Sequence, residues 1–127
     1  MYTLKTEHSF DAAHFLYGYE GKCSNIHGHR WRVVLEVSGE ELTDEGQMRG
    51  MLIDFGDLKK DLKEEVDYLD HCLIMEKGSL KETTLAALES ENFRILQFEF
   101  RPTAENMAKY FYDKMQDRGY TVKEVTV

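Results

Sequence analysis

The chain has 127 residues and a formal net charge of −8, because 24 Asp and Glu residues outnumber 16 Lys and Arg residues. This length predicts a single domain over residues 1–127. The acidic balance argues against a nucleic-acid partner, because binding to phosphate backbones needs a surplus of cationic side chains. No stretch is long and apolar enough to span a bilayer, and no secretory signal opens the chain, so we expect a cytoplasmic protein without a membrane partner.

The first half of the chain predicts two strands and a helix. Residues 2–10 alternate between two faces, and residues 30–37 show the clearest apolar–polar alternation in the sequence. An acidic turn over residues 38–50 and a short apolar run over residues 51–53 follow. Asp54 then has the position of an N-cap, and the next residues repeat apolar side chains at spacings of three and four. The apolar stripe of this helix consists of Phe55, Leu58, Leu62 and Val66.

The second half predicts a strand, a helix and a strand. A weak alternation over residues 94–100 indicates a short strand, and Thr103 is placed as the N-cap of a second helix. Gly119 has the position of a left-handed C-cap, and residues 120–127 alternate again. The order predicts an α+β fold with helices on one sheet face. The buried stripe of the second helix consists of Met107, Tyr110, Phe111 and Met115.

Three of the five histidines, His14, His27 and His29, lie close together in the sequence. Residues two apart in an extended segment project to the same side, so His27 and His29 aim both imidazoles at one point. Antiparallel pairing of the first two strands would bring His14 towards the same point. Three neutral imidazoles with an open fourth position are a familiar catalytic zinc arrangement. The competing interpretation is that these are ordinary loop histidines.

Both cysteines are expected to be free thiols, because the chain carries no export signal. Cys23 could be a metal ligand. We favour a nucleophile or base, because three histidines already suffice and a cationic metal site would lower the pKa of the thiol. Cys72 is interpreted as a small core residue.

Two further groups carry titratable side chains. Asp70 stands beside His71, and such a pair can orient the imidazole or share its proton, which suits proton transfer near neutral pH. A solvated turn would explain the same dipeptide without any function. Glu105 lies in the first turn of the second predicted helix, where the helix dipole favours a carboxylate, and this alone accounts for its position.

The order of these motifs resembles the 6-pyruvoyltetrahydropterin synthase superfamily over nearly the whole chain. Residues 10–14 resemble the first zinc-ligand motif of the family, and residues 23–29 resemble its Cys-x-x-x-His-Gly-His signature. Residues 54–59, 69–71 and 102–106 match three later family landmarks in the same order.

The three-residue spacer between Cys23 and His27 is similar to that of the bacterial 6-carboxytetrahydropterin synthase branch, which acts in queuosine biosynthesis. The resemblance implies a lyase that converts 7,8-dihydroneopterin triphosphate to 6-carboxy-5,6,7,8-tetrahydropterin, acetaldehyde and triphosphate. Two alternatives stay open. One is a 6-pyruvoyltetrahydropterin synthase that only eliminates triphosphate, and the other is a zinc- or pterin-binding module without turnover.

The resemblance also implies roles for individual residues. Zn²⁺ would be held by His14, His27 and His29. Cys23 would be the catalytic base, with Asp70 and His71 as a proton relay. Glu105 would contact the substrate.

The fold that the resemblance implies is the tunnelling fold, a four-stranded antiparallel sheet with two helices packed on one face. Six identical subunits, a dimer of trimers, would join their sheets into a barrel with active sites between subunits. Asp70 and His71 could then serve either the zinc site of their own chain or that of a neighbour. Family members continue past a strand like residues 122–127 into a Glu that anchors the pterin. We expect that the sequence omits this segment, because its loss would expose a sheet edge.

Overall fold

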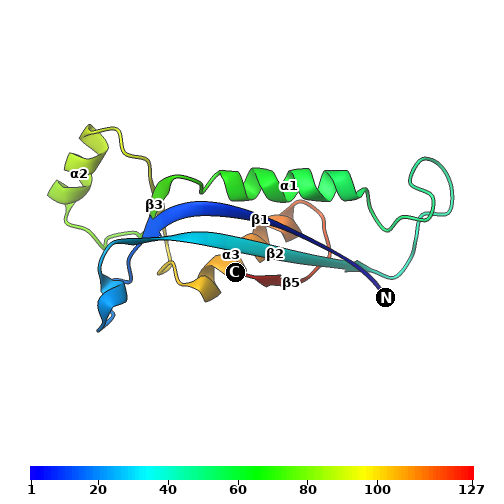
Figure 1. The fold of residues 1–127 in the computed structure, drawn as a ribbon, viewed down its shortest axis with the longest axis horizontal. Helices are drawn as coiled ribbons and strands as arrows, with labels where there is room; N and C mark the ends of the chain where they lie inside the picture. Colours follow the sequence, from blue (N-terminus) through cyan, green and yellow to red (C-terminus); the bar gives the residue numbers. More distant parts are fainter.

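A five-stranded sheet forms the centre of the computed structural model, which describes residues 1–127. The strand order is β4-β3-β1-β2-β5, so β4 and β5 form the two edges. Three α-helices and one short 3-10 helix complete the fold (Figure 1). The elements in chain order are β1 (Tyr2–His14), η1 (Lys22–Ser24), β2 (His27–Gly39), α1 (Phe55–Asp67), β3 (Cys72–Glu76), α2 (Glu82–Ser90), β4 (Ile95–Phe98), α3 (Ala104–Asp117) and β5 (Val122–Thr126).

The long hairpin of β1 and β2 is the frame of the sheet. The two strands pair antiparallel without a break, from Tyr2 opposite Gly39 to His14 opposite His27. Both strands extend further towards their connecting loop than the alternation predicted. The alternation did not reveal this part, because small residues such as Ala12 and Gly28 stand there instead of large apolar ones. The register therefore places His14 and His27 inside paired strands.

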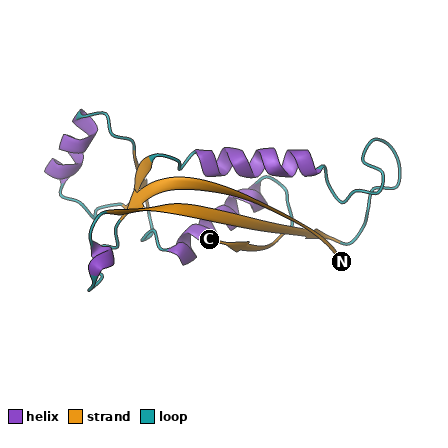
Figure 2. Ribbon diagram, in the orientation of Figure 1, coloured by secondary structure: helices purple, strands orange, loops and turns teal.

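Helices α1 and α3 both pack on one face of this sheet, as predicted, because residues of both belong to a single core cluster. Figure 2 shows both helices alongside the long β1–β2 hairpin. The side chain of Asp54 accepts hydrogen bonds from the first turn of α1, and Thr103 does the same for α3, which confirms both N-caps. Phe10 stacks on Trp31 and meets the edge of Phe111, so the sheet and α3 share one core. The fully buried helix residues are Leu58, Leu62, Val66, Met107, Phe111 and Met115.

Two members of the predicted stripes lie outside the deep core. Phe55 is 42% exposed, because it opens α1 beyond the contact with the sheet. Tyr110 is only partly buried, and it packs against the aromatic rings of Phe98 and Phe100 at the side of the core. Gly119 has a φ of 99°, as expected for a left-handed residue after a helix.

The prediction of a four-stranded antiparallel sheet is wrong at β3 and β4. Strand β3 pairs parallel with β1, and β4 pairs parallel with β3. Parallel neighbours need crossover connections, which α1 supplies before β3 and α2 supplies before β4. Strand β3 was missed because residues 72–75 form an apolar run without alternation. The short apolar run over residues 51–53 lies outside the sheet.

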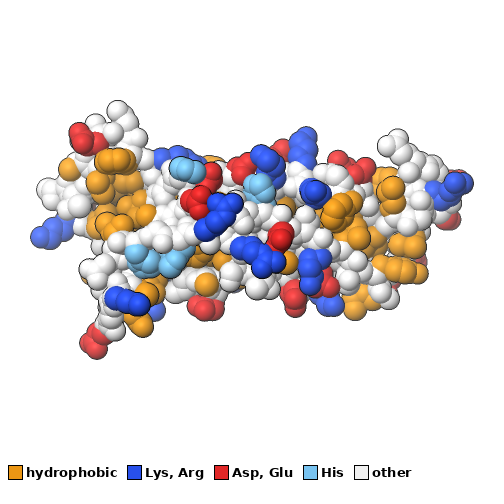
Figure 3. Space-filling view, viewed as in Figure 1, with side chains coloured by type: hydrophobic (Ala, Val, Ile, Leu, Met, Phe, Trp, Pro, Cys, Tyr) orange, Lys and Arg blue, Asp and Glu red, His pale blue; other side chains and the backbone are white.

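Helix α2 was also missed, and it differs from the other two helices. It buries no residue and lies at one end of the molecule, away from α1 and α3 (Figure 1). A helix shows an amphipathic sequence pattern only where one of its faces is buried. The sequence of α2 therefore lacks the pattern by which a helix is predicted. None of the helices combines the length and apolar character needed to cross a membrane. Positive and negative side chains are interspersed over the surface in Figure 3, so the net charge does not form a single acidic field there.

Candidate metal centre and its surroundings

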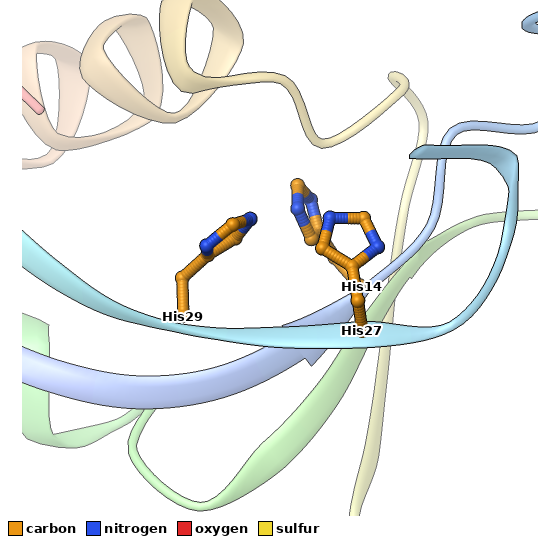
Figure 4. A group of neighbouring side chains, drawn as sticks. All are labelled: His14, His27 and His29. Carbon is orange, nitrogen blue, oxygen red and sulfur yellow. The ribbon is translucent and has the colours of Figure 1, made fainter. Parts of the chain in front are cut away.

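Three imidazoles meet where the β1–β2 hairpin approaches its loop. His14 ends β1 and lies opposite His27 in the register, and His29 follows two residues later on β2. Their ring centroids are 4.5 to 5.1 Å apart, and one potential ligand atom of each residue lies within 4.8 Å of the others. Figure 4 shows the three side chains rising on the same side of the two strands and facing one another. The structure thus brings together the three histidines that the spacing singled out.

Backbone carbonyls set which nitrogen of two imidazoles is available for a metal. His14 Nδ1 donates to the carbonyl oxygen of Pro102 at 2.8 Å, and His27 Nδ1 donates to the carbonyl oxygen of Asn25 at 2.7 Å. A carbonyl only accepts, so both rings carry the proton on Nδ1 and keep the lone pair on Nε2. His14 Nε2 is buried and has no hydrogen-bond partner, as expected of an atom that binds a metal ion.

Burial holds His14 in the neutral form that a metal ligand needs. Desolvation lowers the pKa of His14 below 6.5, the bond to Pro102 opposes this shift, and the neighbouring His27 and His29 lower the pKa further. His14 is 6% exposed, whereas His29 is open to solvent. The arrangement therefore has one buried anchor and an accessible side where a substrate could enter.

Trp31 forms an apolar wall of the centre. Its ring lies 4.7 Å from that of His14, centroid to centroid, and its Nε1 donates to the carbonyl of Ala12 at 3.2 Å. A cavity of about 350 Å³ adjoins this wall. The residues that line it are His14, His29, Arg30, Trp31, Arg32, Ala104 and Val127.

Cys23 is close to the histidines in sequence but is not part of their group. Its thiol is free and half-buried in η1, and its carbonyl accepts a hydrogen bond from the Leu16 N–H at 2.9 Å. The potential metal ligands are the three histidines alone. Cys72 is a buried thiol that donates to the carbonyl of Leu69, and burial raises its pKa. The interpretation of Cys72 as a core residue is confirmed.

Asp70 and His71 form an ordered pair in the turn after α1. Asp70 Oδ1 accepts from the Asp11 N–H at 2.8 Å, and Asp70 Oδ2 lies 2.9 Å from His71 Nδ1. Both bonds lower the pKa of Asp70, and the bond from the Asp11 N–H has the larger effect. The His71 N–H returns to the Asp11 carbonyl at 2.7 Å.

This pair lies outside the metal group of its own chain. The metal group stands on β1 and β2, whereas His71 leads into β3 on the opposite edge of β1. Glu105 lies exposed in the first turn of α3, close in sequence to Pro102, whose carbonyl holds His14. The carbonyls of Asn25 and Pro102 were not identified from the sequence, because every residue carries a carbonyl and only the tertiary fold selects one.

Comparisons with known proteins agree with this architecture. The family model described as 6-pyruvoyl tetrahydropterin synthase matches residues 3–127. The 6-carboxy-5,6,7,8-tetrahydropterin synthase of Haemophilus influenzae is 36% identical over 118 residues, covering 91% of this chain and 83% of the relative. The protein of the same name from Synechocystis is 32% identical over 125 residues, covering 91% and 97%.

Solved structures share the fold at lower sequence identity. An uncharacterized protein from Wolinella succinogenes superimposes with a TM-score of 0.74 at 20% identity, covering 98% of this chain and 90% of that one. The 6-pyruvoyl tetrahydropterin synthase of Caenorhabditis elegans gives a TM-score of 0.61 at 24% identity, covering 91% and 77%. Because the family model spans almost every residue, this chain belongs to the 6-pyruvoyl tetrahydropterin synthase family.

Proposed function

We propose that this chain is a zinc-dependent lyase that converts 7,8-dihydroneopterin triphosphate to 6-carboxy-5,6,7,8-tetrahydropterin, acetaldehyde and triphosphate. The observation that carries the proposal is the three-histidine group, in a chain whose relatives at 36% and 32% identity bear the name of this synthase. The cytoplasm and queuosine biosynthesis are the setting that the family resemblance implies for it.

The donor set fits zinc. Three imidazoles whose nitrogens lie within reach of a single ion, with no fourth protein ligand beside them, match the donor set of catalytic rather than structural zinc sites. When bound there, Zn²⁺ would supply Lewis acidity to oxygens of the substrate. The carbonyl oxygens of Pro102 and Asn25 hold two of the three ligands, His14 and His27, in place before any metal arrives.

We assign the proton transfers to side chains of this protein. Cys23 removes a proton from a substrate carbon as the thiolate, which starts the loss of triphosphate. Asp70 fixes the ring of His71 through the 2.9 Å contact, and His71 carries the proton. Cleavage of the carbon–carbon bond in the substrate side chain, with the addition of one water molecule, then releases acetaldehyde and leaves the carboxylate on the pterin. Glu105 is assigned a contact with the substrate.

We infer that a working site combines residues of two subunits. Within one chain, His71 lies across β1 from the metal group and outside its set of ligands. It borders a largely apolar groove of about 770 Å³ that is also lined by His29 and by the exposed Ile26 and Phe93. The edge strands β4 and β5 leave backbone groups free for pairing with other subunits. These features support a homohexamer, a dimer of trimers, in which sheets join into a barrel.

Product analysis tests the proposed reaction. The zinc-loaded protein is incubated with 7,8-dihydroneopterin triphosphate, and acetaldehyde and pterins are measured by mass spectrometry, with a chelated sample as the control. Acetaldehyde and 6-carboxytetrahydropterin in equal amounts are expected. Accumulation of 6-pyruvoyltetrahydropterin would show that the enzyme stops after elimination. Bound but unchanged substrate would identify a binding module.

A further inference from the structure

Arg94, immediately before β4, reaches back to the turn that carries Asp70 and His71. Its Nη1 donates to the carbonyl oxygen of Asp70 at 3.3 Å, and its Nη2 donates to the carbonyl oxygen of Tyr68. The guanidinium carbon also lies 5.0 Å from the centroid of the Tyr68 ring. One planar side chain therefore contacts two carbonyls and one aromatic face of the same turn.

The turn is in a conformation that requires such support. His71 has a φ of 57°, in the left-handed region that is unfavourable for residues with a Cβ atom. Its side chain is 78% exposed, so core packing does not hold it. Strained residues persist where their surroundings over-determine them, and they gather at functional sites. Here the backbone of Asp11 holds the pair from β1, and Arg94 holds it from the opposite side.

Arg94 itself is anchored beside the pair. Its carbonyl accepts from the Leu73 N–H at 3.0 Å, two residues after His71, so its backbone and its guanidinium hold the chain on both sides of the pair. No carboxylate lies within ion-pair distance of the guanidinium, which is thus free to bind carbonyls. Both Arg94 and His71 border the same apolar groove.

From these contacts, we propose that Arg94 is a positioning residue that fixes the direction of the His71 imidazole. The proposal rests on the proposed function, because it gives His71 its proton-transfer role. The two carbonyls that the guanidinium binds belong to the peptide units that precede Leu69 and follow Asp70. Binding both of them restricts the rotation of these two peptide units. Arg94 needs no contact with the substrate to act in this way.

Kinetics of Arg94→Ala form the first test. Misplacing a catalytic group by about 1 Å costs up to about a hundredfold in rate, so we expect kcat to fall about tenfold or more while KM changes less than about twofold. Arg94→Lys keeps the charge but loses the fork of donors, so it should remain well below wild type. Wild-type activity in Arg94→Lys would overturn the proposal. Arg49→Ala serves as the control, because it removes an exposed arginine that is distant in sequence from Arg94.

A double-variant cycle separates positioning from general destabilisation. If Arg94 acts through His71, adding Arg94→Ala to His71→Ala should lower kcat no further. Two losses that multiply in the double variant would show an independent role and contradict the proposal. Zinc content and the melting temperature are measured for each variant to exclude loss of the fold.

A spectroscopic measurement keeps this test independent of the reaction. With labelled histidine, the five imidazoles give separate NMR signals, and Arg94→Ala should shift or broaden that of His71 while that of His8, which bonds to Asp67, stays in place. An unchanged His71 signal would overturn the proposal. If the wild type made no 6-carboxytetrahydropterin, the proposed function would fail, and the His71 signal would still decide whether Arg94 orders this turn.

Discussion

The Nδ1–H of His14 donates to the carbonyl oxygen of Pro102 at 2.8 Å, across 88 positions of sequence. This bond joins the end of β1 to the residue before the N-cap of α3. It fixes the orientation of a buried imidazole whose Nε2 has no hydrogen-bond partner within the protein. The metal group therefore depends on how α3 is docked on the sheet, as well as on the β1–β2 hairpin.

Replacement of His27 tests the metal group. His27→Ala should abolish stoichiometric zinc binding, because two imidazoles leave an incomplete set of ligands. The loss of folding stability should be below about 1 kcal/mol, because His27 is only half-buried at the start of β2. Elemental analysis of the purified variant checks this result. His8→Ala, which removes a histidine outside the group, is the matched control and should keep full zinc.

The stability of the metal-free protein should depend on pH through His14. The folded-state pKa is lowered from 6.5, so below about pH 6.5 the unfolded chain binds more protons at this residue than the folded chain. The free energy of unfolding should thus decrease as the pH falls from about 6.5 to the folded-state pKa, and this contribution is fully present above 6.5.

His14→Gln provides the comparison, because glutamine does not titrate. In urea unfolding of both proteins without metal, the stability advantage of wild type over His14→Gln should shrink between about pH 7.5 and about pH 5.5. A constant difference over this range would show that His14 has an ordinary pKa.

The two cysteines should behave differently when replaced. Cys23→Ala should lower turnover by about a hundredfold or more and keep zinc, because it removes the proposed base without touching a ligand. Cys72→Ala should cost about 1 kcal/mol of stability through lost packing and leave turnover within about twofold. Steady-state kinetics and elemental analysis of both variants check this. Unchanged turnover in Cys23→Ala would remove Cys23 from the mechanism.

Mixed oligomers test whether sites form between subunits. Co-expressed His29→Ala and His71→Ala subunits should recover up to about a quarter of wild-type activity, because about one site in four then combines an intact metal group with an intact His71. Each variant alone should be inactive or strongly impaired.

A second mixture provides the control. His29→Ala mixed with Cys23→Ala should recover nothing, because His29 and Cys23 are expected to act from the same chain. Recovery in this control would show that His29 and Cys23 act from different chains. No recovery in the first mixture would contradict the assignment of Asp70 and His71 to a neighbour's site.

The local pattern of the sequence was a good guide wherever burial is periodic. The alternation around Val33 and Leu35, and the stripes of α1 and α3, predicted these elements because one face of each packs on the core. The motif order also led to the correct family. Strand β3 and helix α2 were not predictable in this way, because one is an uninterrupted apolar run and the other buries nothing.

The candidate site, too, was predictable from the sequence only in part. By itself, the sequence determined that His27 and His29 share a side, because residues two apart in a strand always do. Only the tertiary structure decided that the Pro102 carbonyl holds His14, that Arg94 holds the turn of His71, and that this turn lies across β1 from the metal group. Carbonyl groups are the same at every position, so their partners are chosen by long-range packing and leave no mark on local sequence.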